Sequence, residues 1–192
     1  MLTLGCDPDT HKLAIAVTDG SSLVAFWQAY VHPDLKEEDA VVATARELSK
    51  LRMRDLPSAP SIVAIEQMRV YDQSTTNRLK VHGLNGLIRV ASTGGAVVAW
   101  SAEHFPNSII VMPTAPEWKG QQSKMANHAQ TLRTLVDNKI KTALLDLPDA
   151  RRGHLMDAVG IALWASSRQQ QRRSDKNDLR TAARKRAKKA KG

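Results

Sequence analysis

The chain opens with the segment Leu2-Thr3-Leu4-Gly5-Cys6-Asp7-Pro8, an apolar run that predicts a buried strand and ends in a carboxylate. The pattern returns in Ser61-Ile62-Val63-Ala64-Ile65-Glu66-Gln67, where Glu66 closes a second apolar strand. A carboxylate in an apolar setting is costly unless positive charge lies beside it. Two carboxylates about 4 Å apart repel by roughly 4 kcal/mol at an effective dielectric near 20. A divalent cation relieves both costs, so Asp7 and Glu66 are candidate metal ligands.

A third acid lies in the apolar segment His154-Leu155-Met156-Asp157-Ala158-Val159-Gly160-Ile161-Ala162-Leu163-Trp164, which predicts a helix over 154–168. Residues three apart share a helix face, so His154 and Asp157 can point at one place. Two metal ions held about 3.5–4 Å apart position water and stabilise a leaving oxygen. The alternative stays open that Asp7 is a turn acid, Glu66 a surface acid, and Asp157 a helix-surface acid paired with Arg151 or Arg152.

Composition limits the class of protein. With 192 residues and 42% apolar content, the chain is long enough for one domain with its own core plus an appendage. No apolar run reaches the roughly 18 residues of a membrane span, and the N-terminus lacks signal-peptide character. Cys6 is the single cysteine, so the chain cannot form an internal disulfide, which favours a cytoplasmic setting. Cys6 itself is interpreted as a buried small hydrophobe.

The net charge of +9 is concentrated at the C-terminus. Residues 171–192, here called the basic tail, hold ten basic and two acidic side chains and so carry +8; the other 170 residues carry +1. A segment of like charge with almost no apolar residues does not fold alone, so we expect disorder there. Such a tail binds phosphates without regard to sequence and with strong salt dependence. The alternative is a solubilising tail without a partner.

The order of elements predicts an α/β fold with a mixed, five-stranded central sheet flanked by helices. Three strands come first, and Asp19-Gly20 between two of them is a hairpin signal. Helices and strands then alternate. The expected strands are 2–6, 13–17, 23–27, 61–66 and 108–112, and the expected helices are 34–53, 74–90, 121–135 and 154–168. Residues 1–170 form the predicted domain. The chain has three linker-like segments, namely 54–60, 137–152 and the basic tail.

These motifs carry a resemblance. Gly5-Cys6-Asp7-Pro8, Ala64-Ile65-Glu66-Gln67 and the helical segment from His154 to Ala162 resemble, in order and spacing, the three active-site motifs of RuvC-type Holliday junction resolvases. The resemblance implies an RNase H-like fold and a homodimer that uses Mg²⁺ or Mn²⁺, two ions per site, to nick opposing strands of a four-way junction. It implies that Asp7 bridges the metals, Glu66 is the second-strand acid and Asp157 the helical acid.

His154 stands where many members of this family have an acid and some have histidine. Imidazole is a weaker ligand for Mg²⁺ than for Mn²⁺, so His154 is either a metal ligand or acts on the attacking water or the product oxyanion. The chain departs from the family after Pro8, where Asp9 and His11 occur near the usual position of a glycine. We interpret Asp9 and His11 as turn residues rather than ligands. The remaining histidines, at positions 32, 82, 104 and 128, show no ligand spacing and are interpreted as structural.

The resemblance also implies DNA contacts. After Glu66 the family has a segment that reaches the junction centre, and here it holds Arg69 and Tyr71, both able to stack on bases. Lys119 and Lys124 resemble basic residues near the scissile phosphate, and Trp118 is interpreted as a core anchor rather than a stacking residue. The helix over 74–90, with two internal glycines, resembles the family's dimer helix. In the basic tail the candidate DNA-binding residues are Arg172, Arg173, Arg184, Lys185, Arg186, Lys188 and Lys189.

The sequence therefore predicts a structure-selective endonuclease that acts on branched DNA in recombination, repair or phage DNA processing, in a bacterial cytosol or encoded by a phage. Two alternatives remain. One is the RuvC-like domain of a DEDD-type transposase, whose further C-terminal domain and lysine-aspartate motif have no counterpart here. The other is a junction-binding module without catalysis.

Overall fold

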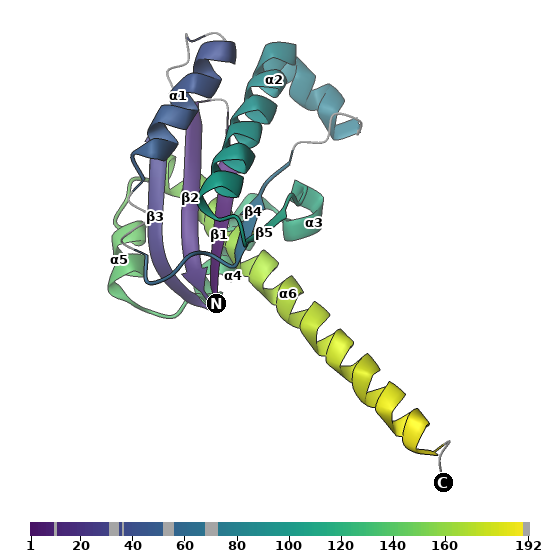
Figure 1. The fold of residues 1–192 in the computed structure, drawn as a ribbon. Helices are drawn as coiled ribbons and strands as arrows, with labels where there is room; N and C mark the ends of the chain where they lie inside the picture. The colour runs from purple at the N-terminus through teal and green to yellow at the C-terminus, as the bar shows by residue number, and fades with distance from the viewer. Residues whose placement is uncertain (10, 31–34, 36, 52–55, 68–72, 190–192) are drawn as a thin grey trace.

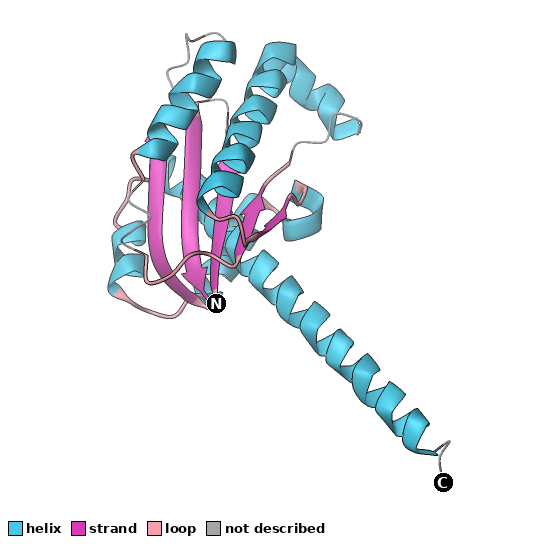
Figure 2. Ribbon diagram, in the orientation of Figure 1, coloured by secondary structure: helices cyan, strands magenta, loops and turns pink. Residues whose placement is uncertain are grey.

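The computed structural model describes residues 1–9, 11–30, 35, 37–51, 56–67 and 73–189, and its centre is a five-stranded sheet (Figures 1 and 2). The strands are β1 (Leu2–Pro8), β2 (Lys12–Asp19), β3 (Ser22–Tyr30), β4 (Ile62–Ile65) and β5 (Ile109–Val111). Their order is β3-β2-β1-β4-β5; β1, β2 and β3 pair antiparallel, and β1, β4 and β5 pair parallel. The mixed sheet predicted from the sequence is therefore confirmed. Gly20, at φ 56°, makes the turn of the expected hairpin.

Helices cover both faces of the sheet (Figure 1). On one face lie α1 (Glu37–Ser49) and α2 (Gln73–His104), and on the other lies α6 (Asp149–Lys189). Three shorter helices surround α6, namely α3 (Ala115–Lys119), α4 (Lys124–Thr134) and α5 (Lys139–Leu145). The layers are thus helix, sheet, helix, as a sheet buried on both faces requires.

Alternation along the strands assigns each side chain to a layer. In β2, Leu13, Ile15 and Val17 pack in the core under α1 and α2, whereas Ala14 and Ala16 pack under α6. In β1, Leu4 and Cys6 belong to the first of these cores. Because successive side chains point to opposite faces, Asp7 belongs to the α6 face. The alanines of β2 are small, which lets α6 lie close to the sheet.

The same alternation applies to β4. Val63 and Ile65 join the core under α2, and Ile62 and Ala64 join a cluster with Ile161 of α6. Glu66 follows β4 directly, and its backbone amide donates to the carbonyl of Cys6 at 3.0 Å. Its parity therefore also assigns it to the α6 face. Both strand-end acids are consequently directed toward the helix that carries the third.

Several elements differ from the prediction. The helix expected over 74–90 continues to His104, and α5 lies within 137–152, which was expected to be a linker. The last helix, expected over 154–168, begins at Asp149 and extends to Lys189, so it includes most of the basic tail. No glycine or proline occurs between 161 and 189, and Ala, Arg, Lys and Gln are strong helix formers. Local propensity therefore favours continuation of α6.

Two further features are the single cysteine and the polarity of the helices. Cys6 is a free, buried cysteine, as predicted. Across the residues that the structure describes, every helix is too short or too polar to cross a bilayer.

Candidate active site

Gly5 fixes the place where β1 and α6 meet. A Cβ atom at this position would lie 2.1 Å from the carbonyl oxygen of Ala158 and 2.6 Å from the amide nitrogen of Ala162, so any side chain would push the helix away. The backbones of β1 and α6 therefore touch two residues before Asp7 and one residue after Asp157. This contact explains why the Gly-x-Asp spacing of the first motif brings the two acids together.

Asp7 and His154 form the first contact between these elements. His154 Nδ1 lies 2.9 Å from Asp7 Oδ2, and His154 Nε2 lies 3.5 Å from Asp9 Oδ2. Burial raises the pKa of Asp7, and the charge of Asp157 adds to this, although the hydrogen bond with His154 opposes it. The hydrogen bond with Asp7 raises the pKa of His154, and the negative charges of Asp7 and Asp9 act in the same direction. The imidazole ring is thus oriented by a carboxylate at each nitrogen.

Asp157 is held by two residues of α4. Lys124 Nζ lies 2.7 Å from Asp157 Oδ2, and His128 Nε2 lies 2.9 Å from Asp157 Oδ1. Burial alone would raise the pKa of Asp157, but the bonds from His128 and Lys124 outweigh it, so the pKa is lowered. Burial also lowers the pKa of Lys124, and the bond with Asp157 outweighs that effect and raises it. Asp157 is therefore a buried, ionised carboxylate with both oxygens engaged.

Glu66 is held by α3. The indole Nε1 of Trp118 donates to Glu66 Oε2 at 3.0 Å. Burial raises the pKa of Glu66 from 4.5 to about 7; the charge of Asp7 adds to this, and the charge of Lys119 and the Trp118 hydrogen bond oppose it. Burial is thus the main reason that the pKa of Glu66 is high, and the neighbouring carboxylate of Asp7 comes second.

Three of these side chains fit a divalent cation. Asp7, His154 and Asp157 each offer one ligand atom, and these atoms all lie within 4.8 Å of one another. Two carboxylates and an imidazole are donors that Mn²⁺ accepts readily and Mg²⁺ accepts through its carboxylates. Burial raises the pKa of both Asp7 and Glu66, and a cation beside these carboxylates would favour their ionised forms. Glu66 is not part of this three-residue group, and we refer to all four residues as the acidic cluster.

The predicted DNA-binding residues lie at several places in the structure. Lys124 contacts the acidic cluster, and Lys119 lies with Nζ 5.3 Å from the centroid of the Trp118 ring. Arg172 and Arg173 are exposed on α6. The candidates Arg184, Lys185, Arg186, Lys188 and Lys189 lie within the range of α6. Arg69 and Tyr71 lie outside the described residues.

The turn after Asp7 has a double role. The backbone amide of Asp9 donates to the carbonyl of Lys12 at 2.9 Å, as its interpretation as a turn residue requires. Its carboxylate nevertheless faces His154, 3.5 Å away. His11 Nδ1 is buried without a hydrogen-bond partner among the described residues.

Sequence reasoning missed two contributors. His128 was interpreted as structural because it shows no ligand spacing, yet it contacts the carboxylate of Asp157, 29 residues away. Its spacing of four from Lys124 places both on one face of α4, and this was the available signal. Trp118 was interpreted as a core anchor; it is buried, as expected, but its indole N–H also binds Glu66.

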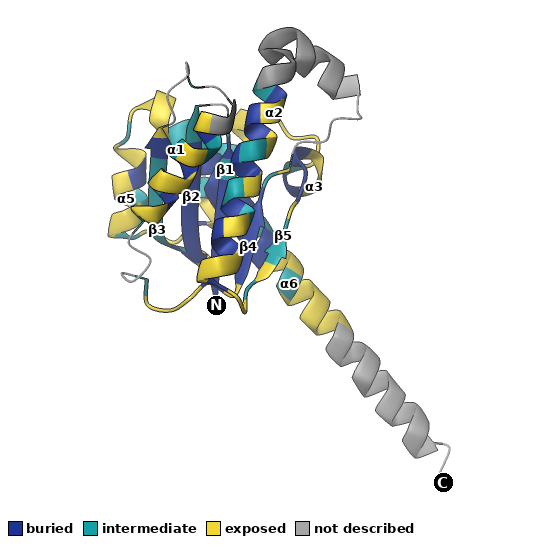
Figure 3. Cartoon of the chain, turned by 45° about the horizontal axis from the view of Figure 1, so that its top comes forward, coloured by how far each residue is buried: buried dark blue, intermediate teal, exposed yellow. Residues whose placement is uncertain are grey.

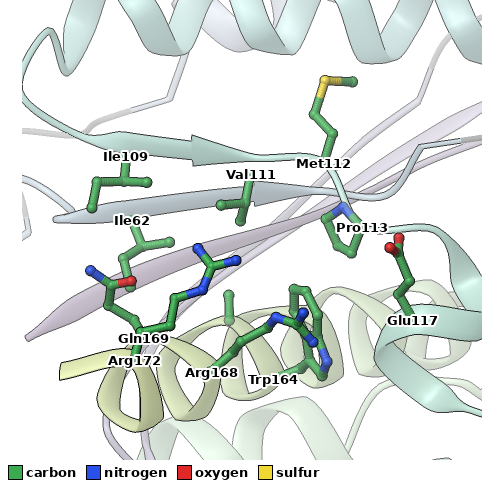
Figure 4. A pocket seen from close by; sticks show the side chains of 11 residues that line it. Ile62, Ile109, Val111, Met112, Pro113, Glu117, Trp164, Arg168, Gln169 and Arg172 are labelled. Atoms are coloured by element: carbon green, nitrogen blue, oxygen red, sulfur yellow. The ribbon is translucent and has the colours of Figure 1, made fainter. Parts of the chain in front are cut away.

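A cavity of about 160 Å³ lies apart from the acidic cluster, between the edge strand β5 and α6 (Figure 4). Ile62, Ile109 and Val111 form its apolar wall. Arg168 and Arg172 lie one turn apart on α6; Arg172 extends toward this wall, and the Arg168 guanidinium lies 5.4 Å from the centroid of the Trp164 ring. The basic residues in the C-terminal half of α6 therefore begin against the body of the domain.

Comparisons with known proteins identify the fold. No protein-family model and no curated protein matches this chain. Among solved structures, Thermus thermophilus RuvC in complex with a Holliday junction substrate matches with a TM-score of 0.57 and 21% identity, covering 85% of this chain and 92% of that one. A second structure of Thermus thermophilus RuvC matches with a TM-score of 0.56 and 19% identity, with 85% and 92% covered. The chain therefore has the fold of RuvC Holliday junction resolvases, as its three sequence motifs predicted.

Proposed function

We propose that this protein is a divalent-metal-dependent endonuclease that cuts branched DNA, four-way junctions foremost, by paired nicks made by a homodimer. The observation that carries the proposal is the convergence of Asp7, His154 and Asp157 within 4.8 Å of one another, in a fold shared with a resolvase seen bound to a Holliday junction. A buried cluster of acids serves no packing purpose and is costly without a cation.

The four residues of the acidic cluster would serve two metal ions. Asp7, Asp157 and His154 would hold one ion, and Glu66 together with Asp7 would hold a second. When bound, Mg²⁺ or Mn²⁺ supplies an activated water and stabilises charge on the phosphate and leaving oxygens. The chain contributes the orientation of these ligands: His128 fixes one oxygen of Asp157, Trp118 fixes one oxygen of Glu66, and His154 fixes one oxygen of Asp7.

Lysines contribute positive charge beside the acids. Lys124 pairs with Asp157 at 2.7 Å, and a cation that binds Asp157 competes with it for that carboxylate. Because the Lys124 side chain is half exposed, its ammonium is then available to a DNA phosphate. Lys119 lies close enough to Glu66 to lower the pKa of that acid, so its charge also reaches the cluster.

DNA affinity is assigned mainly to the basic residues of α6 and of the basic tail. Residues 1–170 carry only +1, so little long-range attraction for a polyanion comes from the body. We assign structure selection to the body and to its dimer, with α2 as the proposed dimer helix. Ile88 of α2 is 44% exposed, which is consistent with an apolar contact there. Arg69 and Tyr71 remain predicted contacts at the junction centre.

The test uses a labelled four-way junction and a linear duplex of the same sequence, each with Mg²⁺, Mn²⁺ or EDTA. The proteins are the wild type, Asp7→Asn, and Asp137→Asn as the control. Asp137 is an exposed acid paired with Lys141, so its substitution makes the same chemical change far from the acidic cluster. The molar mass of the free protein and of the junction complex is measured by sedimentation.

Paired, symmetric nicks in the junction are expected from the wild type and the control, absent in EDTA and in Asp7→Asn. Equal cutting of the linear duplex would replace the proposal with a general nuclease. Binding of the junction without cutting in any metal would favour a non-catalytic module. A monomer that nicks one strand at a time would remove the homodimer from the proposal.

A further inference from the structure

A second cavity, of about 260 Å³, lies between α3, α4 and α6 and adjoins the acidic cluster. Trp118 is common to both, because it lines the cavity and its indole N–H binds Glu66. Among the described residues, the polar part of the lining is amide and hydroxyl, with one ammonium at Lys119 and without a carboxylate. The polar and aromatic lining residues are Trp118, Trp164, Gln122, Asn127, Gln130, Thr131, Thr134, Ser167 and Lys119.

The amide of Asn127 is the most informative of these groups. Its side chain is buried, with the residue 8% exposed, and its Nδ2 has no hydrogen-bond partner among the residues that the structure describes. Leaving a buried donor unpaired is costly, and native proteins keep such groups rarely. A ligand that presents an acceptor inside the cavity would satisfy it.

Gly160 lets α3 and α4 pack closely on α6 at the wall of the cavity. A Cβ atom at Gly160 would lie 2.8 Å from Trp118 Cζ3, 3.3 Å from Thr131 Oγ1 and 3.5 Å from Asn127 Nδ2. An indole edge, a hydroxyl and an amide N–H thus converge above one glycine. Gln122 and Gln130 form a side-chain hydrogen bond of 3.0 Å at the exposed rim.

The cavity continues the acidic cluster along the same two helices. In α4, Lys124 and His128 contact Asp157, and Asn127 and Thr131 line the cavity. In α6, Gly160 follows Asp157 by three residues, about 4.5 Å along the axis. One nucleotide step of B-DNA advances about 3.4 Å along the axis of the duplex, so this offset corresponds to roughly one step. A phosphate at the acidic cluster would therefore place neighbouring nucleotides beside this cavity.

We propose that this cavity binds one unstacked nucleobase of the DNA strand held at the acidic cluster. Asn and Gln amides offer a donor and an acceptor that match base edges, and an indole offers a stacking surface that accepts any base. A neutral, amide-rich lining suits a base better than a phosphate or a metal ion. This inference rests on the proposed function and deepens it, because a base bound here gives the nuclease a sequence preference near the cut.

The test scans single abasic positions through a four-way junction and measures the dissociation constant of each junction in EDTA, so that no cutting is needed. The proteins are the wild type, Asn127→Leu, Thr131→Val and the control Asn107→Leu, which makes the same change at an exposed residue. In the wild type and the control, we expect one abasic position near the crossover to weaken binding about tenfold. In Asn127→Leu and Thr131→Val, that position should cost less than about twofold.

An abasic penalty that is the same in the wild type and in both cavity variants would overturn the inference while leaving the proposed function intact. The inference is equally overturned if no abasic position weakens binding to the wild type. Loss of all preference for the junction over duplex in the wild type would overturn the proposed function and this inference together. Circular dichroism of each variant checks folding, and Thr131→Val is the conservative variant that decides between these outcomes if Asn127→Leu does not fold.

Discussion

The two halves of α6 have opposite characters. The inner half, residues 149–166, carries the ligands His154 and Asp157 and is buried against the sheet from Leu155 to Ile161. The outer half, residues 167–189, leaves the body, and its described side chains from Arg172 to Asp175 are exposed (Figures 1 and 3). One continuous helix therefore joins the acidic cluster to the basic charge. Different residues therefore supply the chemistry and the DNA affinity, and the helix links them mechanically.

The largest expected effect comes from the inner half. Asp157→Asn removes a charge from the three-residue ligand group and keeps the shape of the side chain, although its single amide oxygen can accept from only one of Lys124 and His128. Junction cutting should fall by at least about 10³-fold, and junction binding in EDTA should change less than about threefold. Single-turnover cleavage and a binding titration measure the two quantities. A comparable loss in both would contradict the separation of chemistry from affinity.

Glu66→Gln should lower cutting by about 10²–10³-fold and yet stabilise the metal-free protein. Burial raises the pKa of Glu66 from 4.5 to about 7, so the folded state binds more protons than the unfolded state between these values. This contribution to stability is present below about pH 4.5 and is lost as the pH rises through about 7. In EDTA at pH 8 the variant should be more stable by up to about 3 kcal/mol, with the difference nearly gone at about pH 4. Urea unfolding at both pH values measures it, and equal stability at pH 8 would contradict the burial of an ionised Glu66.

The sequence predicted the sheet and the positions of the acids well because both depend on local patterns. Apolar runs and the Asp19-Gly20 turn located the strands, and the spacing of three between His154 and Asp157 put them on one helix face. Gly5 and Asp7 lie two residues apart, as do Ala64 and Glu66, so each pair lies on one face of the sheet. This spacing also indicates the face on which the acids meet. That information becomes usable only when α6 is known to cover the alanine-bearing face of β2.

What could not be predicted depends on contacts between distant segments. Nothing in the neighbourhood of His128 indicates that its ring reaches Asp157, because α4 must first be placed beside α6. The link between Trp118 and Glu66 spans 52 residues and has the same cause. The continuation of α6 was missed for a different reason: the charge of the basic tail was weighed above the helix propensity of its residues.

Deletion of residues 171–192 tests the outer half. It removes +8 of the net charge of +9, so junction and duplex binding should weaken about 100-fold at low salt. The slope of log K against log salt should become less steep by about 0.9 for each phosphate that the shortened chain no longer neutralises. Cut positions should stay unchanged, because the acidic cluster and α2 remain. Shifted cut positions, mapped on sequencing gels, would show that the tail also selects the structure that is cut.

A smaller effect is expected from His128→Ala, which removes one of the two residues that hold Asp157. The half-saturating metal concentration should rise about tenfold, and cutting at saturating metal should fall much less. His128→Gln retains a donor and should restore part of the metal affinity. The control is His104→Ala on α2, whose ring contacts the carbonyl of Trp100 instead. A fall in saturated cutting without a change in metal dependence would make His128 a participant in the reaction rather than a positioning residue.

The smallest expected effect tests the mechanical link itself. The double substitution Gln170→Gly and Gln171→Gly places a flexible joint in α6 just before the basic residues that begin at Arg172 and keeps every charge, at a helix cost of about 1 kcal/mol per glycine. Gln170→Ala with Gln171→Ala is the matched control, because it changes the same side chains and keeps the helix. If the helix holds the basic charge in a fixed position, the glycine variant should bind junctions about two- to threefold more weakly than the alanine variant, since ordering the joint costs backbone entropy. The salt slope should stay the same, because the number of neutralised phosphates is unchanged. Equal affinity in the two variants would mean that the charge acts as a flexible tether, and the inner and outer halves would then be linked only by the chain.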